Sequence, residues 1–290
     1  MEIIKQHEVI LDIPGESYHF KVKDGVVHRS PVDALHSNHE KADTKTCLHA
    51  LFEDKANDDI VVRASDTDIA VILLSHCSKC QSGLRMVVAT DSKNNRWHIS
   101  LTAIYQKLGP DLCAALPAFH SCTGSDCTSS FVQTGKVRAF ELLEKRPDYQ
   151  NAFIAISSST QVSAAMKQSL LNFNANVYGT KKNISLNCCR HQTFMPVYGP
   201  KGRGKNRLAN LRVINASGLP PCESEVCANI NRASFVATMW ASADKCHIEQ
   251  HPTEDNRWEL VDGHYKLIWF YGEQLPENRI PEEKNRRNLE

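Results

Sequence analysis

The sequence predicts an α/β fold in which a short, mostly parallel sheet is flanked by helices, with a helical and β-hairpin C-terminal extension. Strand-like runs at Ile60–Val62, Met86–Ala89 and Arg96–Ile99 alternate with helical patterns, as in α/β proteins. The first run is apolar throughout, which is typical of a strand buried on both faces of a parallel sheet. Near the C-terminus, an Asp-Gly pair between two alternating segments predicts a hairpin over Trp258–Trp269.

The N-terminal elements follow from local patterns. Val9–Leu11 and Tyr18–Val22 read as two strands, and Pro14–Glu16 supplies the turn of a hairpin. A helix is expected to begin at Ser37, because Ser37-x-x-Glu40 has the form of a capping box and leucines recur beyond it at helical spacing.

The rest of the chain is expected to be largely helical. Leu101–Leu108 and Asp111–Phe119 form helices separated by Gly109-Pro110, and mostly helical sequence extends from Thr123 to about Tyr178. The glycine-rich basic stretch Tyr198–Arg207 is the best internal linker, and a further helix covers Val226–Ala241. We therefore divide the chain into an N-terminal hairpin (1–35), an α/β core (36–147), a helical region with the basic loop (148–215) and a C-terminal extension (216–290).

Composition excludes several protein classes. Hydrophobic residues make up 41% and charged residues 23% of the 290 residues, so a disordered or fibrous chain is excluded. No apolar run reaches the roughly 18–20 residues of a membrane helix, and no signal-peptide pattern follows Met1, so we expect an intracellular protein without a membrane partner. The 34 basic and 33 acidic residues give a net charge of +1, which lacks the strong basic excess typical of nucleic-acid-binding proteins. It does not exclude such a protein, because a neutral total can conceal a local basic patch.

The eleven cysteines are expected to be reduced thiols. Cys77-x-x-Cys80 is the one CxxC pair, and a zinc site would need a second pair at a suitable distance. Cys188-Cys189, Cys222 and Cys227 match that spacing poorly. A zinc-binding interaction module built on Cys77 and Cys80 remains an alternative, but the cysteine pattern does not favour zinc.

A set of carboxylates lies at predicted element ends. Asp66 and Asp68 follow a strand, where ligand sites form in open α/β sheets, and Glu40 and Asp43 are expected to share one helix face. Asp126 lies in a Gly-Ser turn. Converging carboxylates repel one another, and a hard divalent cation such as Mg²⁺ or Mn²⁺ relieves that repulsion. Helix capping and turn formation are the alternative roles of the same acids.

The order of these motifs resembles the flap-endonuclease-like (XPG-type) nucleases of the PIN-like fold. The resemblance covers roughly Ser37 to Leu143. Its motifs are Glu40-Lys-Ala-Asp43, Ser65-Asp-Thr-Asp68, the segment from His98 to Leu108-Gly109, and Gly124-Ser-Asp126. It implies that Asp43, Asp66, Asp68 and Asp126 are metal ligands, with Glu40 beside them. By this resemblance Asp66, Asp68 and Asp126 are also the catalytic acids.

A closer resemblance, over nearly the whole chain, is to uncharacterised transposon-associated animal proteins. It rests on Ser37–Lys45, Cys122–Phe131, Leu219–Cys222 and Trp258–Gly263. Three departures from the nuclease pattern stand out. Lys41 replaces an acid, the G-x-G after the last aspartate survives only as Gln133-Thr134-Gly135, and nothing in 1–35 matches the N-terminal strand and its acids, so the chain is expected to carry an incomplete PIN-like core.

These observations predict a nuclease-derived domain that would hydrolyse DNA or RNA phosphodiesters with Mg²⁺ or Mn²⁺ if its acidic site were complete, and that is weakened or inactive as it stands. The alternative is a non-catalytic remnant of a mobile element that binds nucleic acid or protein. The expected partner is nucleic acid, DNA rather than RNA, and the expected location is nuclear rather than cytoplasmic. The expected phosphate-contacting residues are Lys136 and Arg138 and the basic loop residues Lys201, Arg203, Lys205 and Arg207. A solvated linker is the alternative for that loop.

Overall fold

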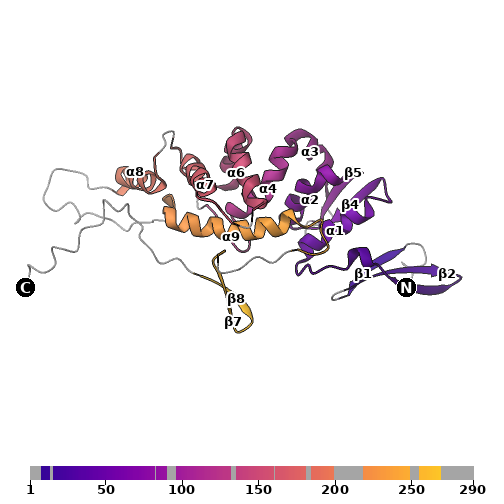
Figure 1. Cartoon of the computed structure of the whole chain (residues 1–290). Helices are drawn as coiled ribbons and strands as arrows, with labels where there is room; N and C mark the ends of the chain where they lie inside the picture. Colours follow the sequence, from indigo (N-terminus) through magenta and orange to yellow (C-terminus); the bar gives the residue numbers. More distant parts are fainter. Residues whose placement is uncertain are drawn as a thin grey trace, which may run out of the picture. The chain divides into compact units, whose positions relative to one another are not determined.

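A computed structural model of the chain shows a mixed α/β architecture with a short sheet, flanking helices and a C-terminal hairpin, which confirms the predicted fold class (Figure 1). The structure describes residues 8–13, 16–81, 83–89, 96–131, 135–159, 161–180, 184–198, 218–248 and 255–268. The chain divides into two compact units: the first comprises Met1–His120 and Ala237–His251, and the second comprises Ser121–Val236 and Pro252–Glu290. This division groups residues differently from the four segments set out above.

The first unit begins with a three-stranded antiparallel sheet. The predicted hairpin is confirmed as β1 (Val9–Ile13) and β2 (Glu16–Lys23), and β2 also pairs with β3 (Val26–Pro31), which the sequence reading missed. The missed signal is Asp24-Gly25, whose φ angles of 53° and 76° place both residues in the left-handed region that a tight hairpin turn requires.

The second sheet of this unit has the order β4 (Asp59–Arg63), β5 (Gly83–Ala89), β6 (Arg96–Ser100). The predicted strands are confirmed, and the sheet is mixed because β4 pairs with β5 in parallel and β6 pairs with β5 antiparallel. The prediction that the first strand is buried on both faces is wrong. In β4, Ile60 and Val62 are buried, whereas Val61 on the other face is 52% exposed. Its partner Arg85 on the central strand β5 is exposed as well, so this face of the sheet is not covered.

Helices pack against this mixed sheet. The helices α1 (Ala42–Glu53), α2 (Thr67–His76) and α3 (Leu101–Leu108) contact one another in sequence, with α1 against β4 and α3 against β5 (Figure 1). Short 3₁₀ turns cover Asp33–Leu35 and Cys77–Lys79, and α4 spans Pro110–Cys122. Ile72, Leu73 and Met86 are fully buried in the core that results.

The predicted start of the first helix is wrong. The helix α1 begins at Ala42 with Lys41 as its N-cap, and no side chain caps it. The hydroxyl of Ser37 is buried and makes no hydrogen bond among the described residues, so the capping box does not form. Residues 36–40 are instead held by the segment after α9, because the Asn38 side chain both donates to the Ile248 carbonyl and accepts from its N–H.

The second unit is mainly helical, as predicted. Its elements are α5 (Gly135–Glu144), α6 (Pro147–Ser157), α7 (Ala164–Val177), α8 (Leu186–Tyr198), most of α9 (Glu223–Ala241), and the hairpin of β7 (Trp258–Val261) and β8 (His264–Leu267). Phe173 contacts Phe153 and Tyr149 edge to face at centroid separations of 5.1 and 5.3 Å. These aromatic rings form the centre of the core of this unit.

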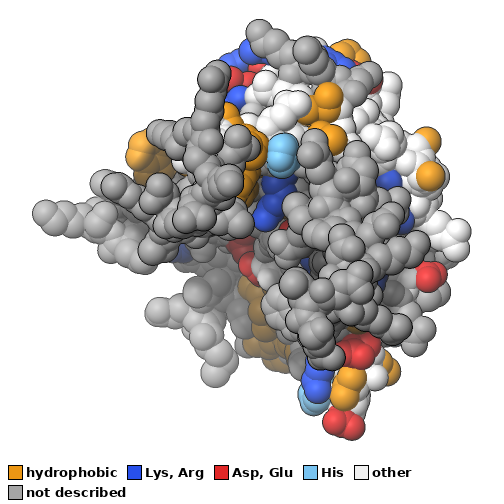
Figure 2. Space-filling view, turned by 90° about the vertical axis from the view of Figure 1, so that its left-hand side faces the viewer, with side chains coloured by type: hydrophobic (Ala, Val, Ile, Leu, Met, Phe, Trp, Pro, Cys, Tyr) orange, Lys and Arg blue, Asp and Glu red, His pale blue; other side chains and the backbone are white. Residues whose placement is uncertain are grey.

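The surface carries both signs of charge. In the view of Figure 2, acidic and basic side chains of the described residues lie interspersed with hydrophobic ones, in keeping with a net charge of +1. None of the described helices is both long enough and apolar enough to cross a membrane.

Candidate metal centre

Asp66 occupies the turn between β4 and α2. Its backbone is extended, and its carboxylate accepts a hydrogen bond from the Asp68 N–H at 2.9 Å, so Asp66 caps α2. The capping alternative is therefore correct for one acid of the set. The cap fixes one carboxylate oxygen of Asp66 and leaves the other available to a ligand.

Asp68 lies in the first turn of α2 and is buried. Its Oδ1 is 2.9 Å from Nε2 of His120, whose ring in turn lies 6.0 Å from that of Trp240. A ring nitrogen at this distance holds the carboxylate in one orientation. His120 therefore positions Asp68 from α4.

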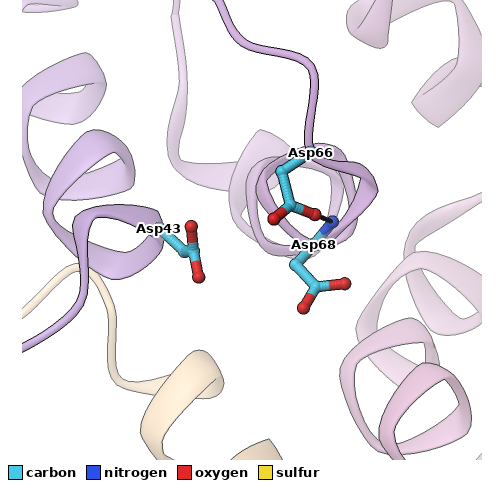
Figure 3. Close-up of side chains that lie close together, drawn as sticks. All are labelled: Asp43, Asp66 and Asp68. Atoms are coloured by element: carbon cyan, nitrogen blue, oxygen red, sulfur yellow. Dashed lines mark hydrogen bonds between the residues drawn. The ribbon is translucent and has the colours of Figure 1, made fainter. Parts of the chain in front are cut away.

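Asp43 brings a third carboxylate from the first turn of α1. One carboxylate oxygen from each of Asp43, Asp66 and Asp68 lies within 4.8 Å of the other two. Figure 3 shows the Asp43 side chain extending from its own helix toward the two aspartates at the start of α2. These three aspartates, which we call the acidic triad, could hold a metal ion.

The negative charge of the triad is stabilised by helix N-termini and, at Asp68, by the His120 ring nitrogen. Asp43 and Asp68 lie in first turns of helices, where the helix dipole and unpaired N–H groups favour carboxylates. Such an effect is worth about 0.3–1 kcal/mol for each charge, whereas three carboxylates in one place repel one another. A divalent cation bound among them would remove that repulsion.

Glu40 lies outside the triad. It is exposed and precedes α1, so the prediction that it shares a helix face with Asp43 is wrong. The reason is the late start of α1, which leaves residues 36–40 in an extended connection. Asp126 is exposed and belongs to the second unit, so its convergence with the triad stays a prediction.

The expected phosphate contacts have different surroundings. The Lys136 ammonium donates a hydrogen bond to the Gly124 carbonyl, which ties the start of α5 to the loop before it. Arg138 is exposed on α5. The basic residues Lys201, Arg203, Lys205 and Arg207 lie outside the described residues.

The CxxC pair is not arranged as a zinc site in the described part of the chain. Burial, reinforced by neighbouring thiols, raises the pKa of Cys77 to about 12, and burial also raises the pKa of Cys80 to about 11. Both side chains are therefore weakly acidic thiols in the metal-free protein. Among the described residues, the one group of three side chains that could hold a metal is the acidic triad.

His120 is the site residue that sequence reasoning missed. It lies 52 positions after Asp68, at the end of an apolar helix, and no spacing rule links the two residues. The only available signal was its place in the last turn of α4, one residue beyond the predicted helix.

Comparisons with known proteins add no relative. No family model matches the chain, and none of the curated proteins or solved structures compared with it is significantly similar.

Proposed function

We propose that the acidic triad binds Mg²⁺ or Mn²⁺ and that the protein is a nuclease-derived domain acting on, or binding to, nucleic-acid phosphodiesters. The observation that carries the proposal is the approach of three carboxylates from two helices to within 4.8 Å. All three donors are hard oxygens, and these suit Mg²⁺ and Mn²⁺ better than zinc.

The residues have separate tasks in this proposal. Asp43, Asp66 and Asp68 would hold the ion, which supplies activation of water and stabilisation of the leaving oxygen of a phosphodiester. The α2 cap fixes Asp66, and His120 fixes the Asp68 carboxylate. Three carboxylates fulfil only part of the pattern implied by the nuclease resemblance, and a lysine replaces an acid at position 41. Weak catalysis, or none, is therefore expected.

Metal binding is tested with the full wild-type chain and two variants of it. We expect Mn²⁺ to raise the melting temperature of the wild-type protein and to leave that of Asp66→Asn/Asp68→Asn unchanged. Asp58→Asn is the matched control, since Asp58 is an exposed acid of the same unit outside the triad. It should keep the wild-type response. An equal response in the double variant would contradict the site.

Catalysis is tested by incubating flap, single-stranded and duplex DNA, and single-stranded RNA, with the protein and Mn²⁺. Cleavage that is lost in Asp66→Asn/Asp68→Asn and kept in Asp58→Asn would support a nuclease. Absence of cleavage together with salt-sensitive binding of the same substrates would instead favour the non-catalytic nucleic-acid-binding remnant.

A further inference from the structure

The second unit contains a cavity of about 630 Å³, which falls in the size range of small-molecule sites. Aromatic rings line it. Phe153 and Phe173 meet edge to face at 5.1 Å deep in the core, and Phe131 and Tyr178 meet edge to face at 6.0 Å. Phe153 and Phe173 are almost completely buried, so Phe131 and Tyr178 are the rings that can present a face to a flat apolar group.

One wall of the cavity is held in place by Asn229 of α9. The Asn229 side-chain oxygen accepts from the Ser129 N–H at 3.0 Å, and its amide donates to the Cys122 carbonyl at 3.1 Å. This single side chain thus connects both ends of the loop 122–129 to a long helix. The cavity wall is preformed, which lowers the entropy lost on ligand binding.

A guanidinium group with no hydrogen-bond or ion-pair partner among the described residues lies at the same cavity. Arg232 is half-buried and lines it, and within the described residues it forms no ion pair or hydrogen bond. Burial and the nearby Arg257 guanidinium both lower the pKa of Arg232, which still remains charged at neutral pH. A partly desolvated cation next to another cation is stabilised by an anion.

A second guanidinium contributes to the lining. Arg190 donates one N–H to the Pro220 carbonyl, and a guanidinium has five N–H donors in all. The acids of the lining are Asp126 and Glu225, and Glu225 accepts from the Cys222 N–H at 3.4 Å where α9 begins. The Glu225 carboxylate is thus engaged at the N-terminus of α9.

We propose that this cavity binds an aromatic monophosphate of nucleotide size, with Arg232 as the principal partner of the phosphate and the aromatic rings as the surface for the base. A phosphate is favoured over a carboxylate because a phosphate monoester carries about 1.5–2 negative charges at neutral pH, which suits two guanidinium groups. This site lies within the second unit and is independent of the acidic triad.

The test is titration calorimetry on the full chain with adenosine 5′-monophosphate, adenosine and inorganic phosphate as probes. We expect the monophosphate to bind about tenfold or more tightly than either fragment, since a hydrogen bond to a charged group is strong. Arg232→Met keeps an unbranched apolar stem and removes the guanidinium group and its charge. It should weaken monophosphate binding by about tenfold.

Two controls make the result decisive. Arg146→Met removes a guanidinium of the same unit that is paired with Asp148 and does not line the cavity, and it should bind as the wild type does. Asp66→Asn/Asp68→Asn should also bind normally, which separates this inference from the proposed metal site. The inference is overturned if the monophosphate does not bind, if adenosine binds equally well, or if Arg232→Met binds with unchanged affinity while melting as the wild type does.

Discussion

Asp66 has two roles that are usually given to different residues. Its carboxylate caps α2 through the Asp68 N–H, and the same side chain belongs to the acidic triad. Capping by Asp66 stabilises the helix, whereas the nearby carboxylates of Asp43 and Asp68 repel the negative charge of Asp66. An asparagine at position 66 separates the two effects, because asparagine caps helices about as well as aspartate and carries no charge.

We therefore expect Asp66→Asn to raise the unfolding free energy of the metal-free protein, by up to about 1 kcal/mol, since two unit charges about 4 Å apart in water interact with about that energy. The same variant should lose most of its stabilisation by Mn²⁺. Urea unfolding with EDTA and with Mn²⁺ measures both effects. Asp66→Ala, which also loses the cap, should be less stable than Asp66→Asn by about 1 kcal/mol without metal. A metal-free Asp66→Asn protein that is less stable than the wild type would contradict charge repulsion in the triad.

A second electrostatic contribution to stability comes from the buried His76 and its contact with Asp244. Nδ1 of His76 donates to the Ile72 carbonyl at 2.9 Å, and Nε2 lies 3.4 Å from the Asp244 carboxylate, which Lys79 also contacts. Burial works to lower the pKa of His76, but the carboxylate, the Cys47 thiol and the Ile72 carbonyl outweigh it and raise this pKa to about 10. Contact with His76 and then Lys79 holds the pKa of Asp244 well below its usual range, against the opposing effect of burial.

The contact between His76 and Asp244 makes the free energy of unfolding depend on pH. A raised histidine pKa stabilises the fold fully below 6.5, and this contribution disappears as the pH rises from 6.5 to about 10. The lowered pKa of Asp244 gives a contribution that is present above 3.8 and is lost in more acidic solution. We expect His76→Gln to be less stable than the wild type near pH 5.5, and the difference to shrink steadily toward about pH 10. Urea unfolding across this range measures the difference, and a gap that does not change with pH would contradict the ion pair.

At the scale of elements, the Asp-Gly turn at 262–263 was predicted correctly, the similar turn at Asp24-Gly25 was missed, and features that depend on tertiary contacts were predicted wrongly. Asp262-Gly263 predicted the C-terminal hairpin because both residues adopt positive φ, 53° and 77°, which this pair of residues tolerates. The capping box predicted at Ser37 does not form, because the neighbouring Asn38 is hydrogen-bonded to the distant residue Ile248. The sequence around Ser37 does not indicate that contact. Val61 was placed in a buried strand because an apolar run does not reveal whether both faces of the sheet are covered.

In the candidate metal site too, residues indicated by the local sequence could be predicted, and a residue that depends on tertiary packing could not. Asp66 and Asp68 could be predicted because they follow a strand that the sequence marks, and helix starts collect carboxylates. Asp43 was predicted although the start of its helix was placed too early, at Ser37 instead of Ala42. His120 could not, because it meets Asp68 only when α4 packs beside α2, and packing depends on many residues at once. Gly124, in the loop after α4, combines a local and a non-local requirement. Its positive φ is a local property of the backbone, whereas its close approach to Ser130 depends on how the loop folds.

Gly124 in that loop gives a test at this scale. Its φ is 120°, and a Cβ added there would lie 2.6 Å from the Cβ of Ser130. Gly124→Ala therefore combines backbone strain with a collision, and we expect it to lower the unfolding free energy by about 2–3 kcal/mol. The control is Gly263→Ala in the same unit, where φ is 77° and no atom lies within 4 Å of the added Cβ, so strain alone should cost about 1 kcal/mol. Equal losses in guanidinium unfolding would show that the contact with Ser130 is not constraining.

At the scale of the whole molecule, the two proposed sites belong to different units. The acidic triad lies wholly in the first unit, and the aromatic cavity lies wholly in the second. A ligand stabilises the part of a protein whose unfolding destroys its site, by about 2.7 kcal/mol at 100 times its Kd. Each ligand should therefore leave its own pattern of hydrogen-exchange protection.

We expect Mn²⁺ to slow amide exchange in α1 and α2, whose first turns carry the triad, and to leave α6 and α7 unchanged. Adenosine 5′-monophosphate should do the reverse, slowing exchange in α7 and in the loop 122–129, which line the cavity. Hydrogen exchange followed by mass spectrometry on the full chain measures both patterns, with Asp66→Asn/Asp68→Asn and Arg232→Met as the respective controls. Protection by Mn²⁺ that persists in the double aspartate variant would place the ion elsewhere. Protection of all four helices by either ligand would show that the two units unfold as one, since the free energy of binding would then stabilise both against opening.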